Sequence, residues 1–256
     1  QSLKASEYSG SMAFPQTRLS VVERTRSDDA EQRRVAMDIL VDAYWKPVYT
    51  YLRLKWSLAP DRAADLTQEF FMSALEKAVI ERYDPGKARF RTYLRLCVDG
   101  LAANAHKAEQ RLKRGGGVVL VPLDVSAAED DLRALEPSVP ADVDDLFYQE
   151  WVRSLMAHAI VVLRARAHEM GRPEMFEVFD RYDLREDEAE QPTYAELARA
   201  LNLTPATVTN HLAAMRRQFR SIILDRLREL TSSDEEFDAE AARLLGTASL
   251  RPRASR

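Results

Sequence analysis

The sequence is poor in the residues that several classes of protein require. Its 256 residues include a single cysteine, Cys97, so no internal disulfide can form and a reducing compartment is expected. Only eight glycines are present, and alternating strand patterns are nearly absent, with residues 118–123 as the one short candidate. No apolar run approaches a membrane span and no signal-peptide pattern occurs, so we expect a cytoplasmic protein without membrane insertion. Together these features predict an all-α fold.

Signals of familiar enzymes are missing as well. The sequence contains no Walker loop, HExxH, CxxC or GxSxG pattern, and Cys97 is expected to be a small buried hydrophobic residue. None of the four histidines has ligand-like spacing to another histidine or to the cysteine. We therefore expect no catalysis, no cofactor and no metal. A helical enzyme with an acidic site within residues 124–150 is the weakest alternative.

Charge is segregated along the chain, although the net charge is only −4. Residues 1–115 carry 20 Lys and Arg against 15 Asp and Glu, whereas residues 116–192 carry 7 against 18. Residues 193–230 are basic again, with 6 against 3. Two basic blocks separated by an acidic one can present local positive faces to DNA, although a globally acidic protein is steered away from it. The pattern also suggests that a partner helps to hold the protein on DNA.

Residues 193–220 carry the clearest local pattern. Thr193 and Glu196 form a capping box for a short helix, and Asn202 tolerates a left-handed turn. Thr204 and Pro205 then begin a second helix. This arrangement predicts a helix-turn-helix whose second helix enters the major groove of DNA, although a helical hairpin within a larger bundle is the plain alternative. The outward residues expected to contact DNA are Thr204, Thr207, Thr209, Asn210, Arg216, Arg217 and Arg220.

Residues 61–80 predict an earlier amphipathic helix. Leu66, Phe70 and Ala74 follow its buried line. A solvated acidic face is the default explanation of the charges on the outer line, but a methionine set among them indicates a docking surface for a basic partner as the alternative. That outer line comprises Asp65, Gln68, Glu69, Met72 and Glu76.

Residues 82–114 contain nine basic residues against three acidic ones, with aromatic residues among them. Cations beside aromatic rings suit single-stranded nucleic acid, because bases stack on the rings while the backbone meets positive charge. Phe90 is expected to lie in the core, whereas Tyr83 and one side of Tyr93 are expected to be available.

These segments resemble a known family. YWKPVYTYLR, DLTQEFF, FRTYL and the basic run ending in KRGGG resemble domain two of an extracytoplasmic-function sigma factor, within the sigma-70 family. Residues 194–220 resemble domain four of the same family. Members are bacterial RNA polymerase subunits that direct the enzyme to promoters. The resemblance covers most of residues 14–245.

The resemblance implies two helical domains joined by an acidic flexible linker. We expect a disordered tail at 1–22, domain two at 23–114, the linker at 115–146, domain four at 147–231 and an extension at 232–256. Residues 1–11 precede Met12, a candidate natural start, and are candidates for a tag remnant. The extension predicts an amphipathic helix that either covers the core of domain four or acts as a regulatory latch.

The resemblance also implies partners and residue roles. Asp65, Gln68, Glu69, Met72 and Glu76 would dock on the β′ clamp helices of core polymerase, and domain four would hold the β flap. The helix-turn-helix would read the minus-thirty-five element. The minus-ten element would be read and opened by Tyr83, Lys87, Arg89, Arg91, Tyr93, Arg95, Asn104, Lys107 and Arg111.

The chain departs from the common family form at two adjacent positions of the basic segment. Asp99 and Gly100 stand where the family often has Arg-Asn, so they are not expected to contact DNA.

Control of the protein could come from an anti-sigma protein or from a Ser/Thr kinase, with Thr67 as a candidate phosphosite. The main functional alternative is a helix-turn-helix regulator that acts without being a polymerase subunit.

Overall fold

The computed structural model describes residues 20–76, 79–112, 143–185 and 191–246, and within these ranges every regular element is a helix. This confirms the predicted all-α fold; the strand candidate at 118–123 lies outside the described residues. No helix in the described ranges is both long and apolar enough to cross a membrane. The elements are α1 (Val21–Arg24), α2 (Ala30–Lys55), α3 (Pro60–Glu76), η1 (Ile80–Arg82), α4 (Phe90–Leu112), α6 (Val143–Glu169), α7 (Pro173–Asp183), α8 (Tyr194–Ala200), α9 (Pro205–Leu230) and α10 (Asp234–Leu245).

The first group of helices, α1 to α4, is organised around α2. Asp29 caps α2 by accepting hydrogen bonds from the backbone N–H groups of Glu31 and Gln32. Helices α3 and α4 pack on α2 through an apolar stripe that includes Leu66, Phe70 and Phe90, all of them buried. The core positions predicted for residues 61–80 are therefore confirmed where the structure describes their side chains.

Pro47 does not break α2, although its position predicts a break or restart. The helix continues from Ala30 to Lys55 with Pro47 buried inside it. A proline in a helix removes one backbone hydrogen bond. Here both flanks of the helix bury large side chains, including Tyr44, Val48 and Tyr51, and this packing offsets the lost bond.

The second group, α6 to α10, is built around the long helix α9. The C-terminal half of α9 buries Ile222, Ile223 and Leu227 in the same core as Trp151 of α6, as the apolar spacing predicts. The N-terminal half belongs to a separate small core beneath α7 and α8, which contains Val178, Leu197, Ala198, Val208 and Leu212.

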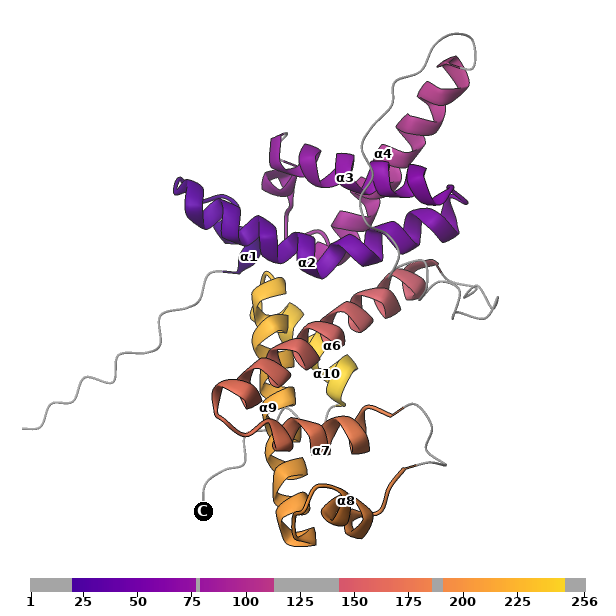
Figure 1. The fold of residues 1–256 in the computed structure, drawn as a ribbon. Coiled ribbons are helices and arrows are strands. Elements are labelled where there is room, and N and C mark those ends of the chain that lie inside the picture. The colour runs from indigo at the N-terminus through magenta and orange to yellow at the C-terminus, as the bar shows by residue number, and fades with distance from the viewer. Residues whose placement is uncertain (1–19, 77–78, 113–142, 186–190, 247–256) are drawn as a thin grey trace, which may run out of the picture.

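The two groups pack directly on each other. Figure 1 shows α6 lying along α2, while α9 extends from α8 toward α1 and α2. Aromatic contacts join the groups: the Trp151 ring stacks on Tyr44 with centroids 6.5 Å apart, and Phe147 meets Tyr51 edge-on at 5.5 Å. One continuous hydrophobic core therefore runs from region 21–102 into region 147–241.

A polar cluster fixes the register of this junction. Arg226 of α9 is 6% exposed and donates to Asp42 of α2 at 2.5 Å and to the Ile39 carbonyl at 3.2 Å. His158 of α6 approaches the same Asp42 carboxylate at 3.2 Å. The hydrogen bond from His158, together with Arg226, lowers the pKa of Asp42 below its usual value. Three helices thus meet at one carboxylate.

We predict that Asp42→Asn destabilises the protein at neutral pH by about 0.5–1 kcal/mol, a small value because Asp42 is more than half exposed. The pKa of Asp42 is lower in the folded state, so its stabilising contribution is fully present above the ordinary carboxyl pKa. That contribution is lost as the pH falls through the lowered value. Urea unfolding of both proteins at a series of pH values should show the difference shrinking in acid.

Asp38→Asn is the matched control, because Asp38 lies one turn earlier in α2 and pairs with exposed Arg34. A loss for Asp42→Asn no larger than for Asp38→Asn would show that the junction does not depend on this carboxylate.

Candidate nucleic-acid and polymerase interface

The outer face of α3 is exposed as the helical spacing predicts. Gln68 and Glu69 are exposed, Asp65 is partly exposed, and Met72 is 52% exposed. The side chain of Glu76 lies outside the described residues. A large apolar side chain open to solvent among acidic ones is a feature that a partner surface can cover.

Thr67 lies on the opposite face of α3 and does not fit the prediction of an accessible phosphosite. Its side chain is fully buried, and its hydroxyl donates to the Ala63 carbonyl at 2.7 Å. The predicted neighbours Asp65 and Glu69 point outward, but helical geometry turns residue 67 toward the core. A kinase could reach this hydroxyl only after α3 separates from α2.

The turn before α4 holds its aromatic residues in the core. Tyr83 is 4% exposed, its ring meets Phe90 edge-on at 5.1 Å, and its hydroxyl shares a hydrogen bond with Ser232 at 2.8 Å. Tyr93 is partly buried and donates to the Val79 carbonyl; burial raises its pKa to about 12. The expectation that Tyr83 is available to a nucleobase is therefore wrong for this conformation, because the ring completes the core between η1 and α4.

The basic residues that begin α4 lie around a cleft of about 440 Å³ between the start of α4, the start of α6 and α10. Five cations line this cleft: Lys87, Arg89, Arg91, Arg95 and Arg243. The aromatic rings of Phe147 and Tyr148 form another part of its wall. The sequence pattern thus correctly groups the cations that precede and begin α4, but it gives no indication of Arg243.

Arg89 and Arg91 are already engaged by a carboxylate of α10. Their guanidinium groups lie 2.8 and 3.0 Å from Oε1 of Glu240, whose side chain is 1% exposed. Arg91 is 11% exposed and lies over the rings of Tyr148 and Trp151, at 4.6 and 5.0 Å from their centroids. Arg91 therefore joins α4 to both α6 and α10.

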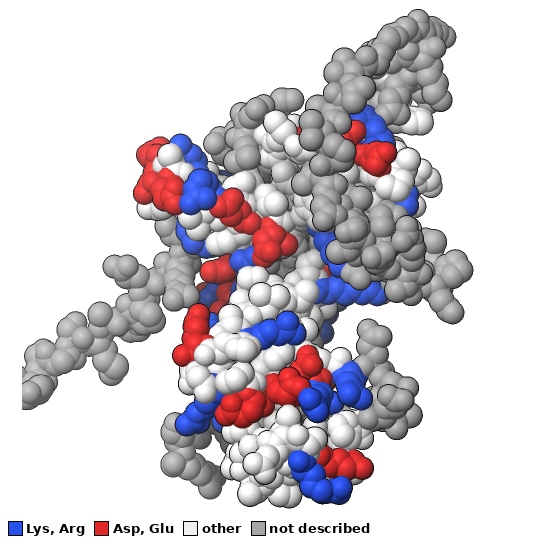
Figure 2. Space-filling view, viewed as in Figure 1, with Lys and Arg blue, Asp and Glu red and all other residues white. Residues whose placement is uncertain are grey.

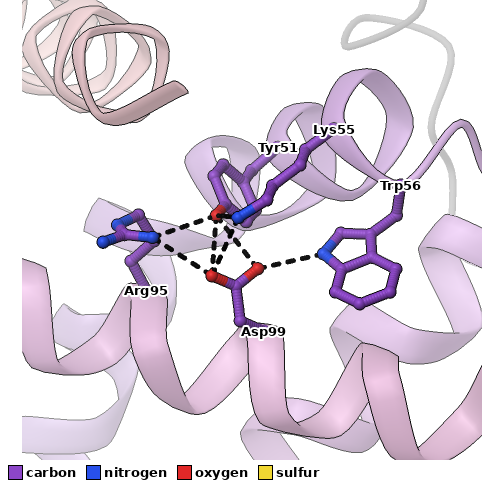
Figure 3. Close-up of polar contacts among 5 residues, drawn as sticks. All are labelled: Tyr51, Lys55, Trp56, Arg95 and Asp99. Atoms are coloured by element: carbon purple, nitrogen blue, oxygen red, sulfur yellow. Dashed lines mark hydrogen bonds and ion pairs between the residues drawn. The ribbon is translucent and has the colours of Figure 1, made fainter. Parts of the chain in front are cut away.

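Asp99 organises a polar cluster between α2 and α4, shown in Figure 3. Its carboxylate accepts hydrogen bonds from Tyr51 at 3.0 Å, Lys55 at 3.0 Å, Trp56 at 3.0 Å and Arg95 at 3.1 Å. Arg95 also donates to the Tyr51 hydroxyl at 3.2 Å. The acid that replaces the common family residue is therefore a structural anchor, and it orients Arg95 along α4.

Three residues further along α4, Asn104, Lys107 and Arg111, are also predicted to contact DNA. Asn104 and Lys107 are exposed, whereas the side chain of Arg111 lies outside the described residues. On the face of the molecule in Figure 2, acidic and basic side chains of the described residues are interspersed over both helical groups. At the start of α4, Arg89 and Arg91 pair with Glu240, and Arg95 pairs with Asp99, so nearby acids offset these cations.

The conformation predicted for residues 193–220 is observed. Thr193 and Glu196 form the capping box, Asn202 has a φ of 54°, and Thr204 accepts a hydrogen bond from the Thr207 backbone N–H. Pro205 begins α9. The turn between α8 and α9 is closed by a hydrogen bond from the Leu203 N–H to the Ala198 carbonyl at 2.8 Å.

The predicted DNA-facing residues of α9 fall into two sets. The outward set comprises Thr204, Thr207, Thr209, Asn210, Arg217 and Arg220, all exposed or partly exposed. Arg216 is different, because its guanidinium forms a two-point ion pair with Asp183 of α7 at 2.7 and 2.8 Å. This pair holds α9 against α7, so Arg216 is a structural residue in this conformation.

Residues 40–112 match the family model for Sigma-70 region 2. This segment, called region 2 below, is similar to Sigma-70 region 2. It contains most of α2, all of α3 and η1, and α4, and the match supports a role as a sigma-70 family sigma factor. Comparisons with curated proteins and with solved structures found no match. Within the described ranges, no group of His, Cys, Asp or Glu side chains could hold a metal ion.

Sequence reasoning missed three groups that shape region 2. Arg26 donates to the carbonyls of Ile80 and Tyr83 at 3.3 and 2.7 Å and so fixes the turn before α4. Asp99 anchors α4, and Glu236 and Glu240 meet it from α10. The spacing of four between these two glutamates, beside Phe237, was a usable signal that one acidic face of this helix is not solvated.

We predict that Asp99→Ala destabilises the protein by about 1–3 kcal/mol, because four donors from α2 and α4 lose their common acceptor. Urea unfolding measures the loss. The control is Asp225→Ala, which removes an exposed carboxylate from α9. Equal stabilities for the two variants would contradict an anchoring role for Asp99.

Proposed function

We propose that this chain is an extracytoplasmic-function sigma factor that binds core RNA polymerase, directs it to specific promoters and helps to open promoter DNA. The match to region 2 carries the proposal, because this region serves polymerase binding and promoter opening in sigma factors. The exposed face of α3 and the paired helices α8 and α9 support it independently. In this role the chain catalyses no reaction itself.

The polymerase-docking surface is the outer face of α3. Asp65, Gln68 and Glu69 offer acidic and polar groups around the exposed Met72 side chain. Helical spacing in the sequence assigns Glu76 to the same proposed surface. A basic partner helix with an apolar patch would complement this surface. The β′ clamp helices of core polymerase are the proposed partner.

The promoter-opening surface is the start of α4. Lys87, Arg89, Arg91 and Arg95 supply charge for the DNA backbone, and Tyr93 supplies an aromatic edge. Asn104, Lys107 and Arg111 would continue this surface along α4. Extruding one base from the stack costs about a few kcal/mol, which these contacts must offset. Tyr83 contributes from within the core by fixing the turn.

The minus-thirty-five surface is the first half of α9. Thr204, Thr207, Thr209 and Asn210 can reach base edges, while Arg217 and Arg220 suit phosphates or guanine. The separate small core beneath α7, α8 and α9 gives this surface its own rigid support. The same part of the chain would hold the polymerase β flap.

We predict that Met72→Lys weakens binding to core polymerase by about tenfold or more, because it replaces the exposed apolar centre of the docking face with a charge. Affinity is measured with labelled protein titrated by core polymerase, and activity by sequencing the transcripts that the reconstituted enzyme initiates. Met170→Lys is the matched control, since Met170 is also about half exposed but follows α6.

The same reconstitution tests the function itself. A sigma factor should bind specific DNA weakly alone and give new transcript start sites with core polymerase. A regulator that works without being a polymerase subunit should instead bind its site tightly alone. Absence of polymerase binding and of new start sites would contradict the proposal.

A further inference from the structure

The acidic face of α10 lies against the start of α4. Glu240 places one carboxylate oxygen within 3.0 Å of both Arg89 and Arg91. Glu236, one turn earlier in α10, accepts a hydrogen bond from the backbone N–H of Phe90 at 3.1 Å. Ser232, just before α10, contacts the Tyr83 hydroxyl. Two carboxylates of one helix thus occupy anion-binding positions at the beginning of α4.

The contact between α10 and α4 combines ion pairs with apolar packing. Phe237 and Ala241 of α10 are buried and anchor the helix, while Glu240 lies among them with its side chain 1% exposed. Burying a carboxylate is costly unless cations compensate it. The Oε2 atom of Glu240 makes no hydrogen bond within the described part of the chain, so this carboxylate is only partly satisfied.

A carboxylate and a DNA phosphate require the same donors from Arg89 and Arg91. Both arginines also belong to the surface through which region 2 is proposed to open promoter DNA. In addition, Arg91 is covered by Tyr148 and Trp151 of α6 and is nearly inaccessible. DNA cannot engage these two guanidinium groups in the same way while Glu240 holds them.

We propose that α10 is an autoinhibitory segment that occupies the nucleic-acid surface of α4 in the free protein and must leave that surface when DNA binds. The inference rests on the proposed function, because it assigns the start of α4 to promoter DNA. Since α10 follows α9 directly, its carboxylates are present at high effective concentration and compete without a second molecule. Because one carboxylate oxygen of Glu240 has no hydrogen-bond partner within the described residues, the contact between α10 and α4 is weak enough for DNA to displace it.

The test uses the full chain and a fluorescein-labelled single-stranded DNA of about 20 nucleotides, long enough to span one such binding site. Binding is followed by anisotropy at a fixed salt concentration. Glu236→Gln with Glu240→Gln should tighten binding by about tenfold, because the competing charges are removed. The matched control, Glu235→Gln with Asp238→Asn, changes the net charge equally on the exposed side of α10 and should leave affinity within about twofold.

Adding Arg89→Ala to the Glu236→Gln, Glu240→Gln protein should remove the gain, because the released cation is the one that DNA uses. Hydrogen exchange of the wild-type protein supplies a readout independent of the variants: amides of residues 236–245 should lose protection when the DNA is added. Equal affinity of the two double variants, or unchanged protection of α10 in the wild-type complex, would overturn the inference.

Failure of the inference is distinguishable from failure of the proposed function. If core polymerase binds and starts transcripts at new sites, but the two double variants bind DNA equally, α10 is not inhibitory and the function stands. If polymerase is not bound at all, the function fails whatever α10 does.

Discussion

The Trp151 side chain of α6 is inserted between α2 and α4 and joins the two helical groups. Its ring is 2% exposed, stacks on Tyr44 of region 2 and lies beneath the guanidinium of Arg91. Burying a side chain of this size contributes about 2–3 kcal/mol, the largest class of single apolar contribution. Because α6 is fixed on α2 in this way, α9 and α10 are brought to the edge of region 2.

The three surfaces proposed for function differ in how far the packing of the two helical groups covers them. The docking face of α3 remains open, with Met72 exposed, whereas the start of α4 is covered by α6 and α10. The first half of α9 points away from region 2 and is supported by its own small core. Polymerase could therefore bind first, through α3. DNA reaches the start of α4 only after the contacts of Glu236 and Glu240 with α4 are broken.

Local patterns in the sequence were sufficient where neighbours along the chain decide the structure. The capping box at Thr193, the left-handed Asn202 and the start of α9 at Pro205 depend on contacts within a few residues. The buried stripe of α3 follows equally from helical spacing. At Pro47 the local rule fails, because tertiary packing on both flanks outweighs one missing backbone bond and α2 continues. The same spacing argument, applied to the inner face, would have placed Thr67 in the core.

Contacts between distant segments could not be predicted in this way. Arg89 and Glu240 are separated by 151 residues, and Asp42 and Arg226 by 184. In each pair, the sequence around one residue does not indicate which distant residue is its partner. Arg216 shows the same limit, since its outward position in α9 suits DNA, yet Asp183 of α7 holds it. The sequence thus identified the residues that carry charge for the site, but not which of those charges are already paired.

The shared hydrophobic core implies that region 2 and the helices from α6 onward form a single cooperative body in the free protein. Native-state hydrogen exchange in increasing denaturant measures this cooperativity segment by segment. Buried amides at residues 48–52 of α2 and 222–227 of α9 should open with the same free energy and the same denaturant dependence. Two distinct opening free energies, with α9 and α6 exchanging while α2 stays protected, would contradict it.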